Sequence, residues 1–194
     1  MFIDKPIAAS LEDVLAIFEA SKKFKIPLFS ASSLRYNKDI ADIDKSKVVG
    51  ADTYGSACLE KTHPDLFWYG IHAVEPLFTV MGSGCREVVR VNTPGTDIVV
   101  GTWNDGRVGT IRGTRTGKGG YGVTVCTFDG KVNLGPYAGY EPLSAEIIKY
   151  FETGKVPVTT DETIEIFAFM EAADESKRRG GAAVNLESIL GKAK

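Results

Sequence analysis

The sequence predicts an α+β protein in which a β-α-β unit precedes an open antiparallel β-sheet with helices on one face. Three observations support this: a strand–helix–strand pattern within residues 1–36, alternating segments between residues 48 and 128, and glycine turns between those segments. A β-α-β unit belongs in a parallel sheet, whereas strands joined by tight turns pair antiparallel. We therefore expect two regions, residues 1–36 and residues 37–194.

The first region begins with a short apolar strand. Residues 2–3 are β-formers, and Pro6 ends the strand and favours an extended backbone at Lys5. Ser10 is a helix N-cap, because acidic residues follow it and the next apolar residues recur at helical spacing. The helix fades before a second apolar strand at residues 27–30. This order is that of a β-α-β unit.

The second region opens with a linker or short helix and then changes to a β-like pattern. Residues 48–57 predict a strand, and a helix follows it. The turn signals Asn104-Asp105-Gly106 and Asp129-Gly130 predict hairpins. Two helices, over residues 142–153 and 160–177, then close the chain. Four further strand-like runs lie before these helices, at residues 86–92, 97–103, 107–113 and 121–128.

The composition is that of an ordinary globular domain. The 194 residues are 43% hydrophobic and 25% charged, with a formal net charge of −2, which argues against nucleic acid or an anionic membrane as partner. No apolar run is long enough for a membrane span, and the first residues do not resemble a signal peptide. The three cysteines form no C-x-x-C pair, so we expect free thiols and a cytoplasmic location.

Lys5 is the first candidate for chemistry. It follows a strand of the β-α-β unit, and the carboxyl ends of such strands are where ligands bind in α/β sheets. An ammonium group there can hold a hydroxyl oxygen and stabilise negative charge that develops on it. The alternative is an exposed lysine near a frayed terminus.

His72 is the second candidate, because it enters a predicted helix. A histidine in that position is often structural, and the only other histidine is His63. Glu75 lies one helical turn later, where it could pair with the imidazole. A metal site formed by these three residues is not expected, because they lack the close spacing of metal ligands.

Several other side chains are candidates for substrate binding. Arg35 follows the second strand, where it would bind a substrate oxygen or brace the hinge between the two regions. Trp68 offers a flat stacking face, and Tyr69 offers a phenol. Trp103 and Arg107 flank a hairpin turn, and a sheet face carrying them would line either a polyol cleft or a subunit interface.

Two glycine-rich stretches, residues 82–87 and 113–119, are not phosphate loops. The first ends in glutamate rather than glycine and follows a helix, and the second lacks the Ser or Thr that follows the P-loop lysine. No complete dinucleotide fingerprint occurs in the sequence.

Taken in order, several short motifs resemble the Gfo/Idh/MocA family of two-domain oxidoreductases. The resemblance covers essentially the whole chain and implies that residues 1–36 are the last part of a Rossmann domain, with the substrate and oligomerisation domain after it. Where this family often has Asp, four residues before the histidine, the chain has Trp68. The motifs are Asp4-Lys5-Pro6, Ser32-Ser33-Leu34-Arg35-Tyr36, Tyr69-Gly70-Ile71-His72, Trp103-Asn104-Asp105-Gly106-Arg107, and the helix from Glu162 to Lys177 with Gly180-Gly181.

The resemblance implies an NAD- or NADP-dependent oxidoreductase acting on a sugar, cyclitol or related polyol. His72 would take the hydroxyl proton and Lys5 would steady the oxygen, with Asp4 and Pro6 beside the nicotinamide. The family also implies a homo-oligomer formed through the open sheet face. Because the dinucleotide fingerprint is missing, we expect this chain alone to be inactive. Two alternatives are a non-catalytic sheet module for oligomerisation or carbohydrate binding, and a cofactor-assisted glycoside cleavage.

Overall fold

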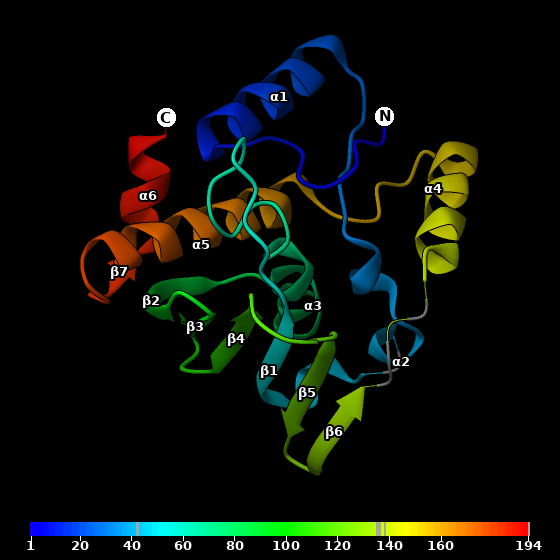
Figure 1. Cartoon of the computed structure of the whole chain (residues 1–194). Coiled ribbons are helices and arrows are strands. Elements are labelled where there is room, and N and C mark those ends of the chain that lie inside the picture. Colours follow the sequence, from blue (N-terminus) through cyan, green and yellow to red (C-terminus); the bar gives the residue numbers. More distant parts are fainter. Residues whose placement is uncertain (42, 135–136, 138, 194) are drawn as a thin grey trace.

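The computed structural model describes residues 1–41, 43–134, 137 and 139–193. In this part of the chain, seven strands form one open sheet in the order β6-β5-β1-β4-β3-β2-β7 (Figure 1). The strands are β1 (Val48–Ser56), β2 (Cys85–Thr93), β3 (Thr96–Trp103), β4 (Val108–Thr114), β5 (Gly122–Thr127), β6 (Gly130–Leu134) and β7 (Val184–Asn185).

Helices cover one face of this sheet. α3 packs on β1 and β4, α5 packs on β2, and α1 lies against α5 on the side away from the sheet (Figure 1). The helices are α1 (Leu11–Phe24), α2 (Lys38–Ala41), α3 (Ile71–Met81), α4 (Glu141–Thr153), α5 (Thr160–Arg178) and α6 (Leu186–Lys192), and the two 3₁₀ turns are η1 (Ser33–Tyr36) and η2 (Lys45–Lys47).

The predicted α+β class, the open sheet and the helices on one face are confirmed. Both predicted turns join antiparallel strands, β3 to β4 and β5 to β6. The sheet is not wholly antiparallel, because β1 runs parallel to β4, with Gly50 opposite Val108. The chain leaves β1 through α3 before it returns to the sheet, and such helical crossovers allow parallel neighbours. The sheet is therefore mixed.

The strand–helix–strand pattern of the first region appears in reduced form. Phe2 and Phe29 form a parallel bridge, in which the Phe29 carbonyl accepts the N–H of Ile3 at 3.1 Å. α1 lies between the two bridging segments and begins after its predicted N-cap, Ser10, whose hydroxyl accepts the N–H of Asp13. Lys5 follows the first segment directly.

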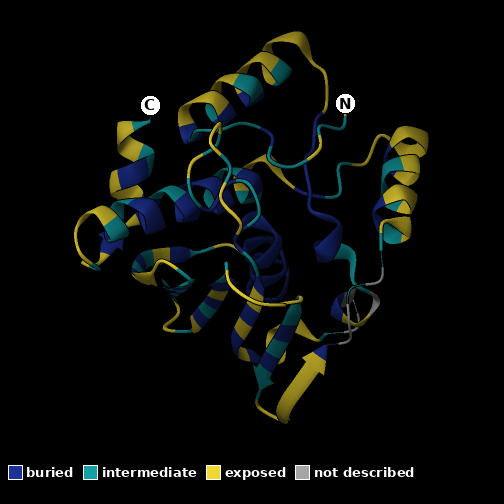
Figure 2. Cartoon of the chain, in the orientation of Figure 1, coloured by how far each residue is buried: buried dark blue, intermediate teal, exposed yellow. Residues whose placement is uncertain are grey.

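α3 lies in the middle of the core, and all of its residues are buried (Figure 2). Its apolar side chains pack between the sheet and α5, together with residues such as Trp103, Val99 and Phe169. Because the helix is surrounded by protein, its polar residues His72 and Glu75 are held in the interior. Buried polar groups need partners, and these partners define the site described below.

A buried ion cluster ties β2, β3 and α5 to the segment before α3. The guanidinium of Arg90, which is 1% exposed, contacts carboxylate oxygens of Asp97 at 2.8 Å, Asp174 at 2.5 Å and Asp65 at 3.0 Å. Arg115 also pairs with Asp65 and Asp97. Burial raises the pKa of Asp174 to about 6 against the opposing charge of Arg90. The cluster fixes the loop that leads into α3.

Candidate active site

The Lys5 side chain lies against aromatic rings and does not extend freely into solvent. Its Nζ donates to the carbonyl of Trp68 at 3.2 Å and lies 5.3 Å from the centre of the Trp68 ring and 5.0 Å from that of Tyr69. The peptide bond to Pro6 is cis. Burial lowers the pKa of Lys5 below its usual value, and the nearby charge of Asp4 opposes that shift. The residues 68–69 that lead into α3 thus position the ammonium group.

His72 is the second residue of α3 and is 8% exposed. Its Nδ1 lies 2.7 Å from the hydroxyl oxygen of Ser32. The ring meets the rings of Tyr69 and Tyr121 edge-on, at centroid distances of 5.5 and 5.8 Å. Burial, and secondly the positive charge of Lys5, lowers the pKa of His72 to about 4. The imidazole is therefore neutral at pH 7.

Glu75 does not pair with His72, contrary to the sequence-based expectation. Its Oε2 lies 2.6 Å from Nε of Arg35, and its Oε1 accepts the backbone N–H of Ser32 at 3.2 Å. Arg35 also contacts Glu162 at 2.6 Å. Although burial alone would lower the pKa of Arg35, the two carboxylates raise it, so the guanidinium stays charged. The charged groups of Arg35 and Glu75 are satisfied within the protein, and we no longer assign them to substrate.

Trp103 and Arg107 are not brought to His72. Trp103 is 1% exposed in the core and its Nε1 donates to the carbonyl of Gly82, while Arg107 donates to the carbonyl of Met81 at 2.9 Å. Both partners lie at the far end of α3, about 14 Å from His72 along a helix with a rise of 1.5 Å per residue. Along β3, alternation turns Trp103 toward the helices. Its predicted role in a substrate cleft is therefore corrected to a core role.

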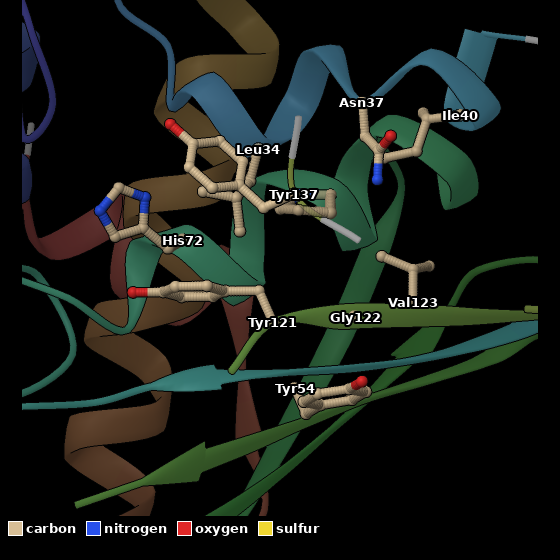
Figure 3. Close-up of a pocket in the computed structure, with 10 residues that line it drawn as sticks. Leu34, Asn37, Ile40, Tyr54, His72, Tyr121, Gly122, Val123 and Tyr137 are labelled. Carbon is tan, nitrogen blue, oxygen red and sulfur yellow. The ribbon is translucent and has the colours of Figure 1, made fainter. Parts of the chain in front are cut away.

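A small pocket opens beside His72 and is lined largely by rings and apolar side chains. Figure 3 shows His72 at one end, with the rings of Tyr121 and Tyr137 next to it. Its free volume in this structure is about 20 Å³, which is room for a water-sized molecule. Its other lining residues are Leu34, Asn37, Ile40, Tyr54, Pro76, Gly122 and Val123.

The sequence does not identify Tyr121 and Tyr137 as site residues, because both lie outside any recognisable motif. Tyr121 precedes β5, and its ring packs against Gly55 of β1, where an added Cβ would come within 2.8 Å of it. The Tyr137 hydroxyl lies 2.9 Å from that of Ser33, in the turn that also carries Ser32. Only the folded chain brings these segments together. The sole local signal is the small residue at position 55, which leaves room for a ring.

The site offers a neutral imidazole, an ammonium group and several phenols within one neighbourhood. Such groups hydrogen-bond hydroxyl and carbonyl oxygens, and the ring faces pack against C–H surfaces. Within the described ranges, no group of three histidine, cysteine or acidic side chains could hold a metal ion. The hydrogen-bonding groups present suit hydroxyl and carbonyl oxygens.

The residues present do not fit the diphosphate of a dinucleotide. One glycine-rich loop does point two N–H groups at an anion, but that anion is the protein's own: Gly84 and Cys85 both donate to Oε1 of Glu165 at 2.7 Å. The other loop, residues 115–121, connects β4 to β5 and does not lead into a helix, as a phosphate loop would. No diphosphate cradle is seen in the part of the chain that the structure describes. Nor is any helix there long and apolar enough to cross a membrane.

The sequence matches no protein-family model and no curated protein. Solved structures, by contrast, match nearly the whole chain. GenD2 from gentamicin A biosynthesis, in complex with NAD, superposes with a TM-score of 0.78 at 16% identity, covering 95% of this chain and 70% of that one. A putative myo-inositol dehydrogenase from Sinorhizobium meliloti 1021 gives 0.78 at 14% identity, covering 95% and 73%.

A third match is myo-inositol dehydrogenase from Lactobacillus casei in complex with NAD(H) and myo-inositol. Its TM-score is 0.76 at 13% identity, and the match covers 95% of this chain and 69% of that one. At such identities the likeness is one of fold. This chain has the fold of a C-terminal portion of the Gfo/Idh/MocA-type dehydrogenases.

Proposed function

We propose that this chain is the substrate-binding part of an NAD(P)-dependent oxidoreductase that acts on a sugar, cyclitol or related polyol. The observation that supports it most is the convergence of Lys5, His72 and the tyrosines 69, 121 and 137 from segments far apart in the sequence. The fold is shared with a dehydrogenase solved with myo-inositol and NAD(H). Fold and site chemistry thus point to the same substrate class.

In this proposal Lys5 and His72 flank the substrate oxygen. The Lys5 ammonium stabilises negative charge on that oxygen, in a partly buried setting where such an interaction is stronger than in water. His72 is neutral and hydrogen-bonds to the same oxygen. The rings of Tyr121 and Tyr137 pack against the ring carbons of the polyol, and their phenols contact its hydroxyl groups. Trp68 and Tyr69 hold Lys5 in place.

The nicotinamide cofactor of such an enzyme accepts or supplies the hydride. Asp4, Lys5 and Pro6 are the residues we expect at its reactive end. Because the diphosphate does not fit the residues present, this chain alone is expected to be inactive in hydride transfer. The choice between NAD and NADP depends on residues that would hold the adenosine half.

Calorimetric titration tests the proposal. The chain is titrated with a panel of cyclitols, hexoses and acyclic polyols, with dicarboxylates as the contrasting class. We expect saturable binding of at least one polyol and loss of that binding in His72→Asn, while Arg178→Met, a surface change, binds as the wild type does. Binding that survives in His72→Asn contradicts the assigned site.

The open sheet face supports a second role, homo-oligomerisation. Val91, Tyr54 and Val108 project from it with 64%, 45% and 44% of their surface exposed. They lie on three strands of the face that carries no helix. Arg112 lies between Tyr54 and Val91 in the strand register, so the exposed apolar side chains stand on a mixed surface. We propose self-association through this face, which sedimentation of Val108→Glu tests: a monomer is expected where the wild type is an oligomer, and an unchanged oligomer contradicts it.

A further inference from the structure

We propose that Ser32 is the positioning residue of His72, and that its hydroxyl donates to Nδ1 and holds the imidazole proton on Nε2. The catalytic meaning of this arrangement rests on the proposed function, whereas the arrangement itself does not. The resembled family often has Asp where this chain has Trp68. In this chain a serine on a different segment would determine which ring nitrogen carries the proton.

The hydrogen bonds of Ser32 determine the direction of the bond. Ser32 is fully buried, and its Oγ already accepts the N–H of Leu34 at 3.2 Å. Among the described residues, the one remaining partner of its hydroxyl is Nδ1 of His72, at 2.7 Å. If Nδ1 carried a proton, the buried serine O–H would be left without an acceptor, which is unfavourable. The short distance is also typical of an O–H donor rather than an N–H donor.

The turn that carries Ser32 is fixed by α3 itself. The Ser32 N–H donates to Glu75, and Glu75 is held by Arg35. His72 and Glu75 lie three residues apart and share a face of the helix. One face of α3 therefore hydrogen-bonds to both the backbone and the side chain of Ser32. This leaves the Ser32 hydroxyl little freedom to rotate.

The Nε2 atom of His72 makes no hydrogen bond within the described ranges, and the residue lines the pocket of Figure 3. A proton on Nε2 is then available to a substrate oxygen. His72 enters the reaction as a hydrogen-bond donor, not as the proton acceptor that the family resemblance implies. The resting Lys5 ammonium first releases a proton to solvent, and its amine then takes the proton of the substrate hydroxyl: the substrate O–H bond breaks, its electron pair stays on oxygen, and an N–H bond forms. The His72 N–H and the new ammonium then both stabilise the alkoxide.

The tautomer can be measured directly in the intact chain. Labelling with ring-¹⁵N histidine marks only two residues, and His63→Gln removes the signals of the other one. Protonated and bare ring nitrogens resonate in separate regions, and couplings to the ring protons identify each nitrogen. At pH 7 we expect Nε2 protonated and Nδ1 bare for His72. A protonated Nδ1, or an even mixture of tautomers, overturns the proposal.

Two serine variants separate positioning from a general effect on the fold. Ser32→Ala is expected to give mixed tautomers, and Ser32→Thr, which keeps the hydroxyl, to restore the Nε2–H form. Ser33→Ala is the matched control, because it removes only the contact with Tyr137 and should leave the tautomer unchanged. A pure Nε2–H form in folded Ser32→Ala contradicts the proposal. No polyol is present, so a failed polyol titration and a failed tautomer assignment remain distinguishable.

Discussion

At the scale of single residues, His72 is a neutral imidazole beside a cation. Burial and the charge of Lys5 together lower its pKa to about 4. Lys5→Met removes the second cause and leaves the first, so the pKa of His72 should rise but stay below the ordinary value of about 6.5. Titration of the ring resonances measures this. Lys22→Met, on the exposed side of α1, is the control, and an unchanged pKa in Lys5→Met would show that the two groups do not interact.

The same shift makes stability depend on pH. The unfolded chain binds a proton at His72 near pH 6.5, whereas the folded chain does so only near pH 4, so stability from this group is lost as the pH falls through that window. A difference of this size corresponds to about 3 kcal/mol.

Comparison with His72→Asn isolates this contribution. The wild type should lose stability relative to the variant between pH 6.5 and pH 4, as measured by urea unfolding. The opposite contribution of Asp174, whose pKa is raised by burial, is common to both proteins and cancels. A difference in unfolding free energy that does not change with pH would contradict a neutral, buried His72.

At the scale of elements, Arg35 joins the turn η1 to both α3 and α5. It pairs with Glu75 on α3 and with Glu162 on α5. Arg35→Met leaves a buried carboxylate without its partner, and we expect a loss of about 3–5 kcal/mol in unfolding free energy. Arg178→Met, which breaks an exposed pair within α5, should cost no more than about 1 kcal/mol. Equal losses in the two variants would show that Arg35 does not join η1 to α3 and α5 in the way described.

The elements also show what local sequence predicts. Alternation and glycine turns predict β1 to β5 near their observed limits, and N-caps such as Ser10 and stops such as Gly154 predict the helix ends. β6 and β7 were not predicted, because β6 is exposed at four of its five positions and β7 has only two residues. The parallel pairing of β1 with β4 depends on a connection through α3, which no local pattern reveals.

The site also has features that the local sequence predicts and features that it does not. Lys5 and His72 stand in short motifs, so sequence identifies them as candidates. The contacts of Ser32 with His72 and of Arg35 with Glu75 each span 40 residues, and the expectation that Glu75 pairs with His72 was wrong for that reason. Trp103 was misplaced because strand alternation alone does not say which face is covered by helices.

At the scale of the whole molecule, the chain is expected to hold a polyol without holding the cofactor. It lacks a dinucleotide fingerprint, and the N–H groups of Gly84 and Cys85 already bind Glu165. Titration with NADH, followed by nicotinamide fluorescence, should therefore show no saturable binding in the micromolar range. Such binding would show that the described part of the chain contains a cradle that the structure does not reveal.

In the proposed function, a polyol binds between Lys5 and His72. The most direct measurement is a titration of the ring-¹⁵N-labelled chain with the panel of cyclitols, hexoses and acyclic polyols. We predict that at least one of them shifts the Nε2 resonance of His72 saturably, that Lys5→Met weakens this response, and that His63 does not respond. Polyol binding by calorimetry with no change at the His72 resonance would contradict the claim.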